Sequence, residues 1–351
     1  MCSFASETNR TLHMSRSTKT GRSSYQLPLH HYFSGRLARC VSAASLSALL
    51  QCPAFLSSCT QEDVLPQYTE ITMDWSTKGA APEAIDLFFF DTPPGEELLD
   101  SYQQLILPQN KSFGISGSGA KRLVALSGKA GEKGRWTQIR TYGNLCKHTF
   151  SLERESSSAP LLCGESLLPA GSSRRAQIQL RPMLTAIRLR SVSCDFSGRP
   201  YAQSRFVNTQ TFLSYAGSEY RPLGEGGGEP VSWLNPGSLD TLAVQALPEP
   251  EMLWQKGIGE VGRTRLYPNQ TFYCYPGAPT QLVLEGRVGD KPCFYPIPLP
   301  SLAPDTRVDL DITLRRMGST APDIPTESGA VILELRCLPW EEGNSQIELF
   351  G

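Results

Sequence analysis

Apolar and polar residues alternate along many short stretches of this chain. That is the pattern of a β-strand with one face buried and the other turned outward. In Tyr68–Trp75, the apolar residues Ile71, Met73 and Trp75 fall on one face and polar residues separate them. We therefore expect this segment to form a strand whose apolar face packs on a core.

Residues 307–314 alternate in the same way, with aliphatic side chains on one face. The pattern places Asp309, Asp311 and Thr313 on the opposite face, in water. Two carboxylates at this spacing could serve acid–base chemistry or bind calcium. Their alternation within a strand favours a solvated sheet face instead.

Other segments are less regular. Residues 84–90 are almost continuously apolar, which is typical of a strand covered on both faces. A short, polar helix is weakly indicated near residues 95–107. Half-buried strands must cover one face with a second layer, so the sequence predicts an all-β fold of packed antiparallel sheets.

The domain organisation is predicted from breaks in this strand pattern. Residues 197–200 interrupt the strands, and a polar, glycine-rich stretch follows at 224–230. We expect an N-terminal β-sandwich at residues 64–198 and a C-terminal one at residues 199–351.

The first 58 residues have the character of a targeting segment. Residues 1–39 are basic and rich in serine and threonine, and a modestly apolar run follows at 40–56. This is the order of regions in a secretory signal, although the long basic part leaves the true start open to Met14 or later. Gln51 and Pro53 argue against a stable membrane-spanning helix.

Residues 56–59, Leu-Ser-Ser-Cys, resemble the lipobox of bacterial lipoproteins. The resemblance makes Cys59 the lipid attachment residue, and residues 59–63 the lipidation and export signal. Several acyl chains on one cysteine would hold the protein firmly at a membrane. The alternatives are a plain signal peptide with an incidental cysteine, or a buried apolar helix.

Enzyme chemistry has little support in the sequence. After Cys59 the sequence has one histidine, His148. No GxGxxG follows a predicted strand, and the P-loop, HExxH and GxSxG motifs do not occur. We therefore expect no catalytic, cofactor-binding or metal-binding residues, and no cofactor. Acidic residues outnumber basic ones after Cys59, so the sequence gives no sign of the basic surface that binds nucleic acid.

Cysteines and aromatic residues leave alternatives open. An exported chain could oxidise its cysteines, or they could serve as small core residues, and their pairing is not readable from the sequence. Six follow Cys59: Cys146, Cys163, Cys194, Cys274, Cys293 and Cys337. Aromatic residues between Tyr267 and Tyr295 could stack on sugar rings, but core packing is the more ordinary use.

The start of the body, residues 70–75 soon followed by residues 86–90, is similar to the anchor and accessory branch of the fimbrillin family of type V pili. The order of segments toward the C-terminus resembles the same family. The segments are a Tyr-Pro-Asn strand at 267–276, a Tyr-Pro-Ile strand at 294–299, the alternating strand at 306–318, a Pro-Asp-Ile-Pro loop at 322–325, and Trp340. The resemblance implies two tandem transthyretin-like β-sandwich domains after a lipoprotein signal peptide. It also implies trimming by an arginine-directed protease and assembly by strand exchange.

One departure from the family bears on the role of the subunit. No Arg or Lys lies between Cys59 and Lys78. This stretch therefore has no evident basic cleavage point on either side of the first strand. We expect the strand with Ile71, Met73 and Trp75 to stay attached. Assembly would then use a second alternating segment at residues 346–350, which carries Ile347 and Leu349.

The predicted function is that of a lipid-anchored cell-surface protein, a fimbrial anchor or accessory subunit that acts by β-strand association. Its expected location is the surface of the outer membrane and the fimbrium. Its expected partners are other fimbrial subunits and the membrane, with host or bacterial surface glycans as a further class. A surface glycan-binding lipoprotein and a fimbrial tip adhesin are the alternatives.

Overall fold

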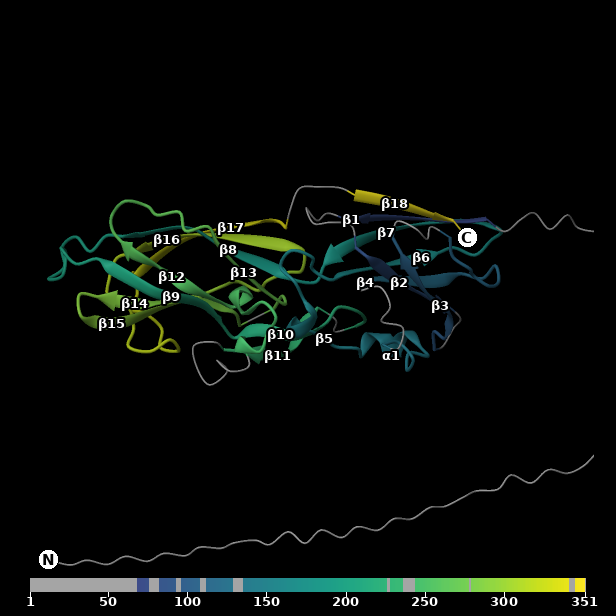
Figure 1. The fold of residues 1–351 in the computed structure, drawn as a ribbon, viewed down its shortest axis with the longest axis horizontal. Coiled ribbons are helices and arrows are strands. Elements are labelled where there is room, and N and C mark those ends of the chain that lie inside the picture. Colours follow the sequence, from purple (N-terminus) through teal and green to yellow (C-terminus); the bar gives the residue numbers. More distant parts are fainter. Residues whose placement is uncertain are drawn as a thin grey trace, which may run out of the picture. The chain divides into compact units, whose positions relative to one another are not determined.

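A computed structural model describes residues 68–75, 82–92, 96–107, 112–128, 135–225, 228–235, 244–277, 279–340 and 345–350 of the 351-residue chain. All of them belong to one compact unit, Gln61–Gly351. Strands dominate this part of the chain (Figure 1). The prediction of an all-β fold with sandwich packing is confirmed. In the described ranges, no helix is both long enough and apolar enough to cross a membrane.

A seven-stranded sheet holds the N-terminal strands and the last one, in the order β18-β1-β7-β6-β4-β2-β3. Its neighbours pair antiparallel except β1 and β7, which run parallel. The strands are β1 (Tyr68–Trp75), β2 (Ala84–Asp91), β3 (Leu99–Ile106), β4 (Lys121–Gly128), β6 (Leu162–Leu168), β7 (Ser173–Pro182) and β18 (Ser345–Phe350).

Both faces of this sheet are covered at β2. Phe88 and Phe90 point into one hydrophobic core, while Leu87 and Phe89 point into another. All four side chains are fully buried, as the continuous apolar run predicts.

Two four-stranded sheets pack face to face further along the chain. Their inner faces meet in one core, to which Ile187 and Leu310 contribute from one sheet and Leu213 and Leu284 from the other. One sheet has β12 (Trp254–Val261), β9 (Phe206–Ser214), β14 (Gln281–Val288) and β15 (Lys291–Pro298), in that order; the other has β13 (Gln270–Cys274), β8 (Thr185–Cys194), β16 (Thr306–Leu314) and β17 (Val331–Pro339).

A small sheet joins early and late parts of the sequence. Its order is β11-β10-β5, with β11 at Glu229–Leu234, β10 at Ala216–Arg221 and β5 at Phe150–Ser151. Because β5 pairs with β10, the chain near residue 150 is fixed to the chain near residue 220 by backbone hydrogen bonds.

Helices are few and short in the described ranges. They include α1 (Tyr142–Cys146) and the 3-10 helices η1 (Leu152–Arg154) and η2 (Pro250–Met252). Thr141 caps α1, because its hydroxyl accepts a hydrogen bond from the Asn144 N–H.

The weak helix prediction at residues 95–107 is wrong, since this segment contains the edge strand β3. Its polarity suits that position, because an edge strand has a single neighbour and exposes much of its surface. Tyr102 and Gln104 also donate hydrogen bonds to Asp86 on β2, at 2.7 and 3.0 Å.

The expectation that Asp309 and Asp311 face water is also wrong. Both are almost fully buried, at 3% and 4% exposure. Arg188 and Arg190 on β8 cover them and form bidentate hydrogen bonds with their carboxylates. Burial raises the pKa of Asp311, but hydrogen bonds from Arg190 and Ser191 outweigh it and hold the pKa below its ordinary value.

The division into domains at residue 198 stays a prediction. Several strands have neighbours across that point, including β5, which pairs with β10. β8, which precedes the point, pairs with β13 and β16, and β18, which follows it, pairs with β1.

Candidate assembly site

Strand β1 lies inside the seven-stranded sheet, between β7 and β18 (Figure 1). It pairs with β7 along its whole length, from Tyr68 opposite Ser173 to Trp75 opposite Leu180. β18 covers the other edge of β1 in antiparallel register, from Glu70 opposite Phe350 to Trp75 opposite Ser345. β1 is therefore an internal strand of the sheet, paired along both of its edges.

The structure brings the two predicted assembly segments together. Ile71 lies opposite Leu349, and Met73 lies opposite Ile347. Ile71, Met73 and Leu349 are fully buried in one core. The alternation of each segment is readable from the sequence, but their mutual pairing is not, because they lie at opposite ends of the described chain.

Side-chain contacts add to the backbone pairing of β1 with β7. Arg174 on β7 is 1% exposed; its Nε donates to Thr69 Oγ1 at 3.3 Å and its Nη1 donates to the Gly119 carbonyl at 3.2 Å. Burial lowers the pKa of this guanidinium. Arg175 and Glu70 also form an ion pair at 3.0 Å between Nε and Oε2. These contacts tie β1 to the body of the sheet.

Strand β18 is held less firmly. It has one neighbour, because it is the edge of its sheet, and it is six residues long. Leu349 is its anchor in the core, while Glu348 is exposed. An edge strand with one neighbour has fewer contacts to break than an internal strand, so its local opening requires less free energy.

An edge strand that leaves its sheet exposes a row of backbone N–H and C=O groups. Such an edge is a template for another strand, and the departing strand can pair with an edge elsewhere. The chemistry that this site supports is therefore non-covalent strand exchange.

The predicted lipid attachment residue, Cys59, lies outside the described residues. Its role stays a prediction. Trp75 and Ile347 are placed by their strand register alone.

His148, the one histidine singled out in the sequence, is half-buried between the rings of Trp136 and Phe150, at 4.8 and 5.1 Å between centroids. Burial lowers its pKa to about 4, and Arg135 and Arg154 contribute to this shift. The ring is therefore neutral at pH 7. Among the described residues, no group of three or more His, Cys, Asp or Glu side chains could hold a metal ion.

The aromatic residues considered for sugar stacking serve mainly as core. Phe272, Tyr275 and Tyr295 are fully buried, whereas Tyr267 is 69% exposed. The six cysteines after Cys59 are free thiols in this structure. Burial raises the pKa of Cys194 to about 11 and that of Cys274 to about 12.

One buried acid escaped the sequence analysis. Glu155 is 3% exposed, and its carboxylate accepts hydrogen bonds from the Tyr275 hydroxyl at 3.0 Å and the Leu161 N–H at 2.9 Å. Burial raises its pKa to about 7. No local pattern marks this residue, because its burial depends on Tyr275, far along the chain.

Comparison with known proteins finds matches at the level of the fold. No family model and no curated protein matches the sequence. Solved structures do match. One is a fimbrilin of Porphyromonas gingivalis, with 11% identity and a TM-score of 0.54, over 80% of this chain and 100% of that one.

Two further structures carry the name "putative cell adhesion protein". The one from Bacteroides eggerthii has 17% identity and a TM-score of 0.57, over 79% of this chain and 98% of that one. The one from Parabacteroides distasonis has 10% identity and a TM-score of 0.56, over 80% of this chain and 98% of that one. These comparisons confirm, at the level of the fold, the fimbrillin resemblance found in the sequence.

Proposed function

We propose that this protein is a lipid-anchored subunit of a cell-surface fimbria, in an anchor or accessory role, and that it joins a neighbouring subunit through β18. The observation that carries this proposal is the pairing of β18 with β1 at the edge of the seven-stranded sheet. The fold shared with a fimbrilin supports it.

The exchange of β18 has a simple energetic basis. A strand that moves from its own sheet to an equivalent edge on a neighbour exchanges one set of backbone hydrogen bonds for another of the same kind. The apolar side chain of Leu349 leaves one core pocket and needs another. The neighbour therefore needs both an open edge and an apolar pocket in register with it.

Retention of β1 distinguishes the anchor or accessory role from that of a shaft subunit. The first arginine after Cys59 is Arg122, in the middle of the sheet on β4. Its Nε donates to Glu97 at 2.7 Å, and its side chain is 27% exposed. Cleavage there would break an interior strand. The family resemblance implies processing by an arginine-directed protease. Such processing would therefore leave β1 attached and paired in its sheet.

The lipid anchor follows from the lipobox-like sequence that ends at Cys59. Because β1 comes soon after Cys59, a chain that keeps β1 can also keep its lipid. The absence of a basic cleavage point between Cys59 and Lys78 would thus preserve both the lipid anchor and β1 in the mature protein.

The N-terminus of the mature protein tests this proposal. We expect mass spectrometry of protein recovered from cells to find an acylated Cys59 joined to the peptide that contains β1. We also expect fimbrial subunits to be recovered with it after cross-linking at the outer membrane. A mature form that begins after Lys78 would contradict retention of β1 and would assign the protein to the fimbrial shaft.

A further inference from the structure

Strand β17 is the last strand of its four-stranded sheet and pairs with one neighbour, β16. The pairing is regular from Thr306 opposite Pro339 to Leu314 opposite Val331, without a bulge. No strand of the described ranges pairs with the other edge of β17. The strand therefore presents an edge of nine residues to a further strand.

The backbone hydrogen bonds at the two ends of β17 show which of its residues face the open edge. Ala330, just before the strand, accepts from the Arg315 N–H at 2.7 Å. Trp340, just after the strand, donates to the Asp305 carbonyl at 3.2 Å. Because the direction of the backbone groups alternates along an antiparallel strand, the even-numbered residues face β16 and the odd-numbered ones face outward. The outward-facing residues are Val331, Leu333, Leu335, Cys337 and Pro339.

The side chains along this edge are complementary to those of a second copy of the same strand. A two-fold axis at Leu335 relates two antiparallel β17 strands so that Glu334 lies opposite Arg336 of the second copy, and the reverse pair follows by symmetry. On the same face, Ile332 lies opposite Leu338 of the second copy. The odd-numbered residues, whose backbone groups face outward, then form the hydrogen-bonded pairs of the new ladder.

The adjacent registers that keep these hydrogen bonds place like charges together. An axis at Glu334 sets this carboxylate opposite its own copy, and an axis at Arg336 does the same for the guanidinium. Like charges directly opposite each other on neighbouring strands are destabilising, whereas opposite charges stabilise the pair. The charges of β17 therefore favour the register centred on Leu335.

Both charges of β17 lack an ion pair within the described part of the chain. Glu334 and Arg336 are exposed, and neither forms a salt bridge with another described residue. Glu334 lies opposite a like charge, Asp311 of β16. Arg336 lies opposite Asp309, whose carboxylate already accepts hydrogen bonds from Arg188. A second copy of β17 supplies a partner for each charge.

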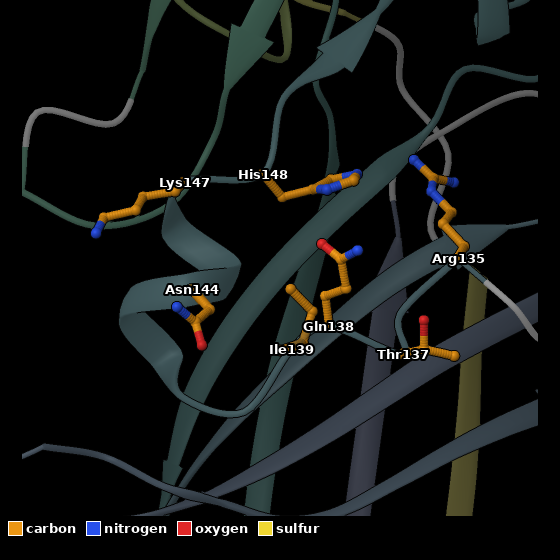
Figure 2. A pocket seen from close by; sticks show the side chains of 7 residues that line it. All are labelled: Arg135, Thr137, Gln138, Ile139, Asn144, Lys147 and His148. Carbon is orange, nitrogen blue, oxygen red and sulfur yellow. The ribbon is translucent and has the colours of Figure 1, made fainter. Parts of the chain in front are cut away.

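Arg135 is a cation that the fold already uses, unlike Arg336. In the pocket beside α1, which Figure 2 shows, its guanidinium lies over the rings of Trp136 and Phe150, at 4.6 and 5.2 Å from their centroids. Burial raises the pKa of Glu155 to about 7, and the charge of Arg135 opposes that rise. The unpaired charges of β17 have no such role within the fold.

The core side of β17 also has apolar surface that a second strand would cover. Val331, Leu333 and Leu335 pack against the core between the two four-stranded sheets, but each stays partly exposed. Pairing of two β17 strands extends the sheet over these side chains and buries more of their apolar surface.

We propose that β17 is a dimerisation strand, which pairs antiparallel with β17 of a second copy of this chain about a two-fold axis at Leu335. The two four-stranded sheets that contain β17 then form one continuous sheet across the dimer. This pairing does not use β18, so it is independent of strand exchange with a fimbrial neighbour.

Charge reversal in the full chain tests the pairing. Two differently tagged copies are expressed in the same cells, and the recovery of one with the other is measured after detergent extraction. We expect Glu334→Arg and Arg336→Glu each to lower this recovery about tenfold, because each change turns two attractive pairs into two repulsive ones. The double variant has opposite charges again and should restore recovery. Lys291→Glu, at an exposed position of the edge strand β15, is the matched control and should behave like the parent.

A single cysteine tests the register covalently. Leu333 lies opposite the native, exposed Cys337 of the second copy, and a hydrogen-bonded pair has Cα atoms about 5.5 Å apart, which a disulfide can span. Leu333→Cys should therefore give a disulfide-linked dimer on oxidation. Within one chain these two positions are about 13 Å apart along the strand, too far for a disulfide. Val331→Cys lies opposite Pro339 of the second copy, beyond reach of its Cys337, and should stay uncrosslinked.

Several results would overturn the assignment. They are no recovery of one parent copy with the other, recovery that neither single charge reversal lowers, and failure of the double variant to restore it. Equal dimer from both cysteine variants, or none from Leu333→Cys, would reject the register. A disulfide from Leu333→Cys to a different protein would assign the edge to another strand and would also reject the dimer.

Discussion

Ionisation of Glu155 should make the stability of this protein fall as the pH rises through neutrality. The carboxyl is buried between the Tyr275 hydroxyl and the Leu161 N–H, and burial raises its pKa from 4.5 to about 7. The substitution Glu155→Gln tests this. It keeps the size of the side chain and can still accept from Leu161 and donate to Tyr275, but it cannot ionise.

The expected magnitude follows from linkage between proton binding and folding. A pKa raised from 4.5 to about 7 makes the ionised carboxylate about 3 kcal/mol less favourable in the folded chain than in the unfolded chain. Between these two pH values, the folded protein keeps the Glu155 proton and the unfolded chain releases it. The stabilisation is therefore fully present below pH 4.5 and is lost as the pH rises through about 7.

His148 acts in the opposite direction over a similar range. Its pKa is lowered from 6.5 to about 4, so its contribution is present above pH 6.5 and is lost as the pH falls through 4. Because the ring is only half-buried, solvent screening reduces this contribution to about 1–2 kcal/mol. The two slopes partly cancel in the parent protein, and the difference between parent and variant isolates Glu155.

Urea unfolding, followed by tryptophan fluorescence at pH 5, 6, 7 and 8, measures this difference. We expect the advantage of Glu155→Gln over the parent to grow by about 2–3 kcal/mol from pH 5 to pH 8. Glu225→Gln, at an exposed position, is the control and should follow the parent. Parallel profiles for Glu155→Gln and the parent would refute the reasoning.

Three further predictions concern the anchor and the candidate assembly site. Cys59→Ala should abolish labelling with a palmitate analogue and release the protein from the membrane; undiminished label on the variant would contradict lipidation. Ile71→Ala empties a fully buried position of β1 and should lower the free energy of unfolding by about 2–5 kcal/mol, whereas Ile332→Ala, 41% exposed on β17, should cost less than about 1 kcal/mol. Leu349→Ala should speed amide hydrogen exchange in β18 more than in β1, because β18 opens locally; equal effects on both strands would contradict its weaker attachment.

Local periodicity predicts much of this fold. Strand β1 and the doubly buried strand β2 are both readable from runs of a few residues, because alternation and continuous apolarity report directly on which faces are covered. The prediction that Asp309 faces water is wrong for a physical reason. Its burial depends on Arg188, on a neighbouring strand that only the tertiary fold brings alongside.

The candidate sites depend still more on contacts between distant residues. The segments of β1 and β18 each have a strand pattern, but nothing local states that they pair with each other. Glu155 becomes a buried acid only when the fold brings Tyr275 into hydrogen-bonding contact with it.

A reversible lock on β18 tests the central claim most directly. Thr72 and Glu348 lie opposite each other on β1 and β18, and neither is buried, so the pair Thr72→Cys and Glu348→Cys suits a disulfide between the strands. The control is the same replacement at Thr313 and Ile332, an antiparallel pair on β16 and β17. Both are made with the exposed Cys337 replaced by serine.

Recovery of the protein in cross-linked complexes with fimbrial subunits is then compared under oxidising and reducing conditions. Exchange of β18 predicts that the lock on β1 and β18 abolishes these complexes when oxidised and restores them when reduced, while the control pair has no effect. Complexes that form equally well with β18 locked in its own sheet would contradict the account.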